Sequence, residues 1–223
     1  MLNWLRKTLG RSESNRKPHS SGPDARPTNF PSRRSGSVTV SKWWKAEDVS
    51  VKSNKRGSQG LADLMREMRL KILNASPSDF GLTQTEEFPH VWGLVMDWPL
   101  PAGIMTLVCF TTGDASIYTT TSFGLLGGIA HESVRTAAKN AIKVAQQYYK
   151  DATQTKEYPY PANNQVHFYL VCYDEIRMIV ADLEAVSRTG DKSSGLYTAA
   201  QGVITRLRLI AQPEMEKRVR SSY

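Results

Sequence analysis

The segment SFGLLGGIAHESVR (residues 122–135) is the part of the chain whose residue types and spacing come nearest to a phosphate-binding loop. Such loops bind phosphate through backbone N–H groups exposed at the start of a helix. Gly124, Gly127 and Gly128 are spaced G-x-x-G-G, not G-x-G-x-x-G, and the next two residues are not the Lys and Ser or Thr of a P-loop. We expect a structural strand-to-helix corner here. A protein- or peptide-binding surface and a weak anion or nucleotide site are the alternatives.

The histidines and cysteines do not have the spacing of a metal or nucleophile motif. His131 opens the tripeptide HES, but Arg135 stands where H-E-x-x-H needs its second histidine. Cys172 and His167 are five residues apart on one predicted strand, so their side chains point to opposite faces. Cys109 lies in another strongly apolar run. We therefore predict no metal site, no cofactor and two buried cysteines.

Carboxylates are the remaining groups that could support catalysis. Four aspartates lie near predicted strand ends or turns, where acids usually serve turns and solubility: Asp97, Asp114, Asp174 and Asp182. A hydrolase with paired carboxylates has no further support in the sequence. Because no set of chemical groups converges, the chain is predicted not to be an enzyme.

Cations are distributed unevenly. Residues 1–57 contain 13 Lys and Arg against 4 Asp and Glu, a net charge of +9, whereas residues 58–223 have a net charge of −1. The segment 11–42 is rich in Ser, Arg, Lys, Pro and Gly, a composition that cannot bury enough apolar surface to order itself. The sequence predicts a basic, largely disordered N-terminal arm.

The arm offers three kinds of contact. Trp43 and Trp44, between two lysines, are candidate anchors for docking on a protein. Trp4, Leu5 and Leu9 could form one face of a short amphipathic helix at a membrane surface. The scattered cations could instead contact nucleic acid, or the arm could have no defined partner.

A second basic feature lies on a predicted helix. Arg135, Lys139 and Lys143 are spaced four apart, so they form a row along one face, which suits an acidic partner.

Apolar periodicity predicts the helices and strands that position these candidate residues. We predict helices at 60–74, 131–151 and 196–211, and strands at 90–98, 104–112, 115–122, 165–172 and 175–183. Glu67 and Lys71 should pair, and Gly113-Asp114 should turn a hairpin. Short links between strands favour antiparallel pairing. The predicted fold is α+β, with about five antiparallel strands packed by two or three helices, in one domain at 58–212 followed by a charged tail at 213–223 beginning near Pro213.

Two resemblances accompany these patterns. The block from VWGLVMDW through GLLGG to HESVR, with GVITRLRL near the end, resembles a family of uncharacterised bacterial proteins. The order of elements is similar to profilin-like and roadblock/longin-like domains, which implies a central antiparallel sheet and docking or dimerising surfaces.

No apolar run approaches the roughly 20 residues that a membrane-spanning helix needs, and the opening residues lack a signal-peptide core. The predicted function is therefore that of a non-enzymatic cytoplasmic interaction or adaptor module that binds a protein partner or itself. A small-ligand or phosphate-binding domain centred on 122–135 is the first alternative, and membrane or nucleic-acid attachment through the arm is the second.

Overall fold

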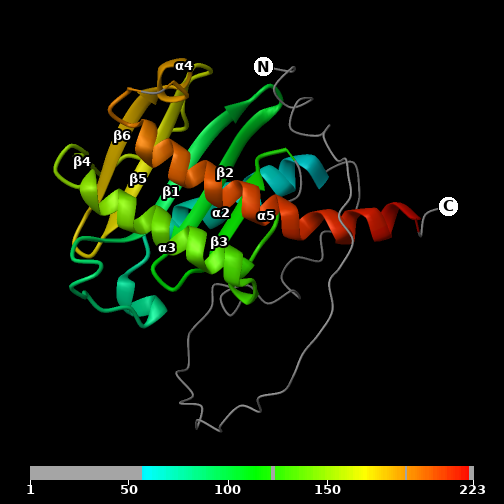
Figure 1. The fold of residues 1–223 in the computed structure, drawn as a ribbon. Coiled ribbons are helices and arrows are strands. Elements are labelled where there is room, and N and C mark those ends of the chain that lie inside the picture. Colours follow the sequence, from blue (N-terminus) through cyan, green and yellow to red (C-terminus); the bar gives the residue numbers. More distant parts are fainter. Residues whose placement is uncertain (1–56, 122–123, 189, 221–223) are drawn as a thin grey trace, which may run out of the picture. The chain divides into compact units, whose positions relative to one another are not determined.

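The computed structural model describes residues 57–121, 124–188 and 190–220, without the side chains of 57–59, 61 and 212–220. The chain divides into two units, Met1–Ser35 and Gly36–Tyr223, and all described residues belong to the second. In chain order (Figure 1) the elements are α2 (Gly57–Leu73), η3 (Pro77–Phe80), β1 (Val91–Leu100), β2 (Gly103–Phe110), β3 (Ala115–Thr119), η4 (Gly128–Ala130), α3 (Glu132–Gln147), β4 (Thr153–Thr155), β5 (Gln165–Cys172), β6 (Ile176–Asp182), α4 (Leu183–Val186) and α5 (Ser194–Arg220).

The strands form one antiparallel sheet in the order β3-β2-β1-β5-β6-β4. The meander β1–β3 and the hairpin β5–β6 join where β1 pairs with β5, so β1 lies near the middle of the sheet. The α+β class and antiparallel pairing are confirmed, but the strand count is six rather than five. The extra strand, β4, is three residues long and too polar to show an apolar period.

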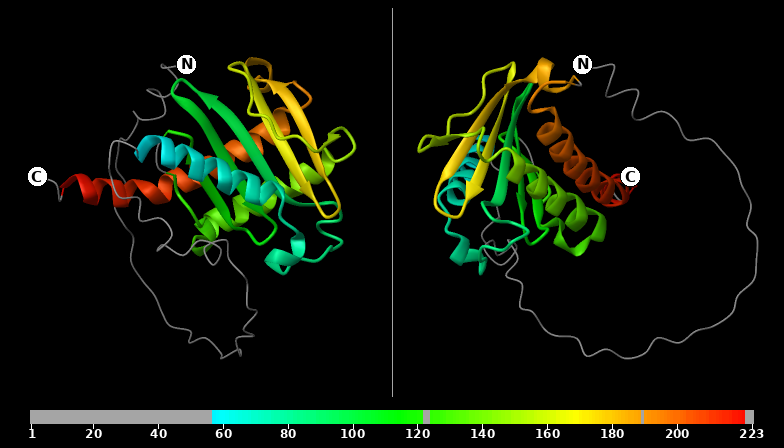
Figure 2. Two further views of the ribbon diagram at one scale, coloured as in Figure 1. Left: turned by 180° about the vertical axis from the view of Figure 1, so that it is seen from behind. Right: turned by 60° about the vertical axis from the view of Figure 1, so that its left-hand side comes forward.

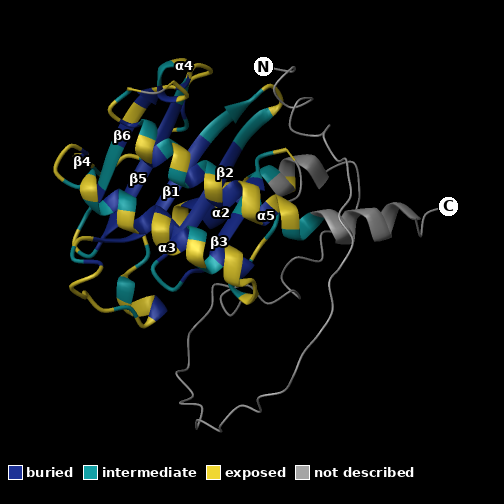
Figure 3. Ribbon diagram, in the orientation of Figure 1, coloured by how far each residue is buried: buried dark blue, intermediate teal, exposed yellow. Residues whose placement is uncertain are grey.

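Helices cover both faces of this sheet. Figures 1 and 2 show α3 and α5 against one face and α2 against the other. Because both faces are covered, β1 is buried continuously from Val91 to Asp97 instead of alternating between buried and exposed (Figure 3). The apolar core is accordingly divided into two clusters, a larger one under α3 and α5 and a smaller one under α2.

The end of α2 and the turn that follows are fixed by local chemistry. Ser76 accepts a hydrogen bond from the Ser78 N–H and its own N–H donates to Asp79, which makes a capping box for η3. Gly81 closes η3 at φ 63°, a left-handed conformation that favours glycine. The predicted Glu67–Lys71 pair is present, with 2.9 Å between Nζ and Oε1.

Several boundaries differ from the sequence prediction; for example, α2 begins three residues earlier and β3 ends three residues earlier. The predicted helix at 131–151 ends four residues earlier, at Gln147. The last helix, α5, runs to Arg220, so the prediction that it ends at residue 211 is wrong, and the charged tail at 213–223 stays a prediction. A proline usually ends a helix, yet here the helix includes it. No helix in the described part of the chain is both long and apolar enough to cross a membrane.

Candidate functional site

The glycine-rich corner uses its own backbone groups to turn the chain. After β3 the chain doubles back, and Leu125 and Ile117 exchange backbone hydrogen bonds of 2.6 and 2.9 Å. The Gly127 N–H donates to the Ser116 hydroxyl at 3.0 Å, with Gly127 at φ 76°. Two of the N–H groups that a phosphate would need are therefore already engaged within the fold.

Close packing explains the glycine at the end of this corner. A Cβ atom added to the buried Gly128 would lie 2.6 Å from Val134 Cγ1 and 2.8 Å from Leu207 Cδ2. Such distances are too short for non-bonded carbon atoms, which need about 3.5 Å or more. The geometry agrees with a structural corner at which η4 meets α3 and α5, and it adds no support for the anion site predicted at Gly124, Gly127 and Gly128.

The basic row on α3 is partly occupied by intramolecular contacts. Arg135 donates to the carbonyl of Ile129 at 2.6 Å and forms an ion pair with Glu132. Lys143 Nζ lies 2.7 Å from Glu87 Oε1. Lys139 is exposed and makes no ion pair within the described part of the chain. Two of the three cations are thus already neutralised by neighbouring carboxylates.

The remaining site residues predicted from the sequence are Trp4, Leu5, Leu9, Trp43 and Trp44. They lie outside the described residues, so their roles in docking and membrane contact stay predictions.

A polar row crosses the sheet on the face that α2 covers. The strand registers place Tyr118, Thr106, Asp97 and His167 beside one another on β3, β2, β1 and β5. Asp97 is fully buried and accepts a hydrogen bond from the Thr106 hydroxyl at 2.7 Å. The prediction that Asp97 serves a turn or solubility is therefore wrong, because it lies inside the domain rather than at its surface.

Arg69 of α2 is the partner of Asp97. Its Nε donates to Asp97 Oδ2 at 2.7 Å, Nη2 lies 2.6 Å from the same oxygen, and the guanidinium is 1% exposed. Nη1 also donates to the Tyr158 carbonyl at 2.9 Å and Nη2 to the Pro159 carbonyl at 3.4 Å. The guanidinium stacks on the Tyr160 ring, with 4.5 Å between Cζ and the ring centroid. One buried cation thus joins α2, β1 and the segment 156–161, hereafter the strap.

Two side chains of β5 hold the same strap. The Pro159 carbonyl accepts from the Tyr169 hydroxyl at 2.5 Å and lies 3.1 Å from His167 Nδ1. A carbonyl can only accept, so Nδ1 carries the proton in this arrangement. Within the row, only the buried Tyr118 hydroxyl lacks a hydrogen-bond partner among the described residues.

The Arg69 cluster hereafter comprises Arg69, Asp97, Thr106, His167 and Tyr169. Burial is the largest single influence on the pKa of each of its ionisable groups. It raises the pKa of the Asp97 carboxyl, a rise that Arg69 and the Thr106 hydrogen bond oppose. Burial also works against the charged guanidinium, yet the neighbouring Asp97 leaves the pKa of Arg69 raised. The pKa of His167 is lowered, mainly because burial penalises the imidazolium, despite its contact with the Pro159 carbonyl.

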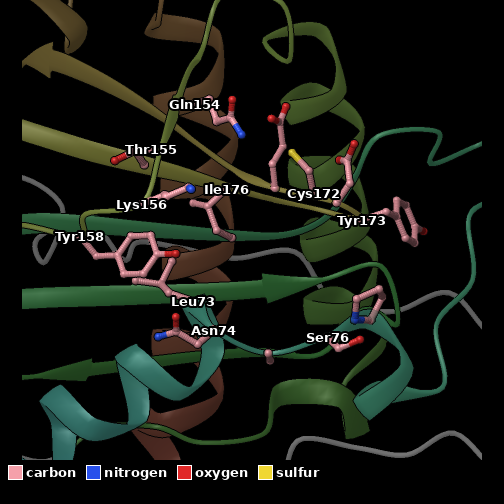
Figure 4. Close-up of a pocket in the computed structure, with 14 residues that line it drawn as sticks. Leu73, Asn74, Ser76, Gln154, Thr155, Lys156, Tyr158, Cys172, Tyr173 and Ile176 are labelled. Carbon is pink, nitrogen blue, oxygen red and sulfur yellow. The ribbon is translucent and has the colours of Figure 1, made fainter.

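An open cavity of about 370 Å³ lies at the opposite end of the strap (Figure 4). One wall is formed by the end of α2 and the turn into η3, a second by β4 and the strap, and the third by the β5–β6 turn. Figure 4 shows side chains from all three walls around this space, including Asn74, Lys156 and Tyr173. The size lies within the range of ligand-binding pockets, about 300–1,000 Å³.

Some polar groups of the cavity are engaged and others are not. Asn74 donates to the Leu70 carbonyl at 2.7 Å, and the Tyr173 hydroxyl donates to the Thr83 carbonyl at 3.0 Å. Gln154, Lys156 and Asp174 are exposed, and their side chains make no hydrogen bond or ion pair with any described residue. Charges of both signs are therefore available to a molecule that enters the cavity.

Cys172 is the one thiol in the cavity lining. It is 4% exposed, and burial, with the nearby carboxylates Glu175 and Asp174, raises its pKa to about 12. A thiol with such a pKa is almost wholly protonated at neutral pH, and only a thiolate is a strong nucleophile. Cys109 is also buried, and burial raises its pKa as well. Among the described residues no three His, Cys, Asp or Glu side chains lie together in a group that could hold a metal ion.

The cavity lies beside an edge of the sheet. The Cys172 N–H donates to the Glu175 carbonyl, and the Leu183 N–H donates to the Asn164 carbonyl. Hydrogen-bonded positions alternate along an antiparallel pair, so every second residue of β6 between these two bonds is hydrogen-bonded to β5. The intervening residues bond to Thr153 and Thr155, so the backbone of Gln154 points outward from the edge. A three-residue edge strand followed by a lysine is a feature that discourages strand addition. The cavity is therefore a better binding surface than the edge itself.

Comparison with known proteins gave no match: neither protein-family models, nor curated proteins, nor solved structures match this chain. The resemblance to uncharacterised bacterial proteins and to profilin-like or roadblock/longin-like domains stays a prediction.

Sequence reasoning missed both the Arg69 cluster and the cavity. A signal for the cluster was present, because Arg69 falls between Met65, Met68 and Ile72 on the apolar stripe of its helix. Asp97 likewise interrupts an apolar strand two residues after Val95. The cavity has no local signal, since its walls come from three segments far apart in the sequence.

Proposed function

We propose that this domain is a protein-interaction module and that the cavity between α2, β4 and the β5–β6 turn is its binding face. The observation that carries the proposal is the pair of exposed, unengaged charges, Lys156 and Asp174, on two walls of an open cavity. Buried polar groups elsewhere in the domain are mostly satisfied by one another, as expected for a folded scaffold.

The occupant is a segment of a partner protein that carries an acidic and a basic side chain. The acidic side chain meets Lys156, the basic one meets Asp174, and apolar parts of the segment lie against Leu73 and Ile176 at the base of the cavity. Charge complementarity of this kind fixes the register of a partner and raises its association rate. Thiol catalysis has no support at this face, because burial raises the pKa of Cys172.

The proposal keeps the predicted class of interaction module but moves the binding face. The basic row on α3 is the rival face, and Lys139 is its unengaged member. Since Lys139 and Lys156 are both exposed lysines, one charge reversal at each position distinguishes the two faces.

The test is selection of binders from a phage-displayed random peptide library on the full chain. Selected peptides should carry charges of both signs. Their binding should weaken by about tenfold or more in Lys156→Glu and Asp174→Lys, the loss expected for one charge-assisted contact, and stay unchanged in Lys139→Glu. Peptides that bind all three variants equally, or that lose binding only in Lys139→Glu, contradict the proposal.

A further inference from the structure

The strap that forms one wall of the cavity cannot hold its own position through backbone pairing. Its sequence from Tyr158 is Y-P-Y-P, and proline has no N–H group to donate to a sheet ladder. The strap therefore depends on donors that reach its carbonyl groups from outside. The Thr155 hydroxyl of β4 donates to the Glu157 carbonyl at the start of the strap, and the other donors are side chains of α2 and β5.

Arg69 is the donor that reaches two consecutive carbonyls. It donates to the Tyr158 carbonyl at 2.9 Å and to the Pro159 carbonyl at 3.4 Å. The same guanidinium donates to the Asp97 carboxylate, which holds it in place. Tyr158 is itself part of the cavity wall, and its ring packs edge-on against Tyr169 at 5.9 Å. Arg69 therefore contacts the backbone of a residue that forms part of this wall.

The opposite wall belongs to the same helix as Arg69. Leu73 and Asn74 line the cavity one turn further along α2. From these contacts we infer that Arg69 is a positioning residue of the cavity, which holds the strap at a fixed distance from the end of α2. The inference rests on the proposed function for its binding consequence, but its effect on the strap is measurable without any partner.

The experiment compares the full-length chain with two arginine-to-lysine variants of α2. Arg69→Lys keeps a cation beside Asp97 but loses the planar fork that contacts three acceptors at once. Arg66→Lys, at an exposed position on the same helix, is the matched control. Hydrogen exchange is followed at the strap amides and at the amides of β1 and β2.

In Arg69→Lys we expect strap amides to exchange roughly tenfold faster or more, the factor that corresponds to losing a hydrogen bond to a charged group. The same variant should lose affinity for the library-selected peptide. Exchange in β1 and β2 should change much less, whereas a merely structural role would accelerate all regions together. Strap exchange as slow as in Arg66→Lys overturns the inference.

The two hypotheses fail in different ways. If no peptide binds the wild-type chain, the proposed function fails while strap exchange still tests Arg69. If the strap loosens in Arg69→Lys but the peptide binds as before, Arg69 holds the strap without positioning the cavity, and the inference is wrong. If Arg69→Lys does not melt cooperatively, the same exchange and binding measurements are made on Asp97→Asn, which keeps the arginine but removes the charge of its carboxylate partner. The results expected, and those that would overturn the inference, are the same.

Discussion

The Arg69 cluster and the cavity contain similar residue types but use them in opposite ways. At the cluster, one arginine and one aspartate are almost wholly buried, and each is satisfied by several partners within the fold. At the cavity, Lys156 and Asp174 are exposed and have no such partner among the described residues. A charge that is fully satisfied inside a protein specifies its structure, whereas a charge left unengaged beside a cavity is available for recognition.

The strap links these two regions. Its carbonyls complete the hydrogen bonding of Arg69, and its side chains form part of the cavity wall. Substitutions at the cluster should therefore change stability, and should change binding only through the strap, whereas substitutions at the cavity should change binding with little effect on stability.

The largest effect is expected from Arg69→Leu. It leaves Asp97 buried without its cation, and breaking a buried pair in this way costs about 3–5 kcal/mol of unfolding free energy. Urea unfolding of the single variant and of Arg69→Leu/Asp97→Leu measures the effect. The double variant should recover part of the loss, and a double variant less stable than Arg69→Leu would contradict the account of a buried charge.

The next effect is expected at the corner, which was predicted to be structural, with a weak anion site as an alternative. Gly128→Val should lower the unfolding free energy by about 1–3 kcal/mol, because the added carbons overlap Val134 and Leu207. Gly202→Ala, at an exposed helical position with no atom within 4 Å of the added carbon, is the control and should be neutral or slightly stabilising. Stabilisation of the wild-type chain by phosphate or nucleotides in thermal-shift assays would argue against a purely structural corner.

A smaller effect is expected from pH, through His167. Its pKa in the folded chain lies below the unfolded value of about 6.5, so the unfolded chain takes up the proton first as pH falls. Its contribution to stability is complete above pH 6.5 and is lost as pH falls from there through the folded pKa. Urea unfolding at pH 7.5, 6.5 and 5.5 should show this slope, and His167→Gln should reduce it. An unchanged slope would show that the proton is taken up elsewhere.

The smallest change in stability is expected at the cavity. Lys156→Glu and Asp174→Lys should each alter the unfolding free energy by no more than about 0.5 kcal/mol, the usual range for exposed positions. The same variants should lose peptide binding. A loss of several kcal/mol at either position would mean that the cavity, too, is part of the scaffold.

Most of the fold was predictable because apolar periodicity is a local signal. The α2 stripe, the β1–β3 meander and the β5–β6 hairpin all follow from their residue patterns. β4 was not predictable, since three polar residues acquire their strand conformation only from pairing with β6. The length of α5 was not predicted, because a proline such as Pro213 usually ends a helix, whereas α5 continues through it to Arg220.

The candidate site was far less predictable than the fold. Sequence spacing predicts that Arg135, Lys139 and Lys143 lie on one face of a helix. It does not predict that Arg135 pairs with Glu132 or that Lys143 pairs with Glu87. The cavity depends on contacts between segments up to about 100 residues apart, a separation at which sequence periodicity carries no information.

Hydrogen exchange of the full-length chain with and without a library-selected peptide tests the central claim most directly. The account predicts slower exchange at residues 154–158 and 173–176, which line two walls of the cavity, and little change at the glycine-rich corner or along α3. Slower exchange confined to residues 124–135 or to the face of α3 that carries Lys139 would contradict it and place the binding face elsewhere.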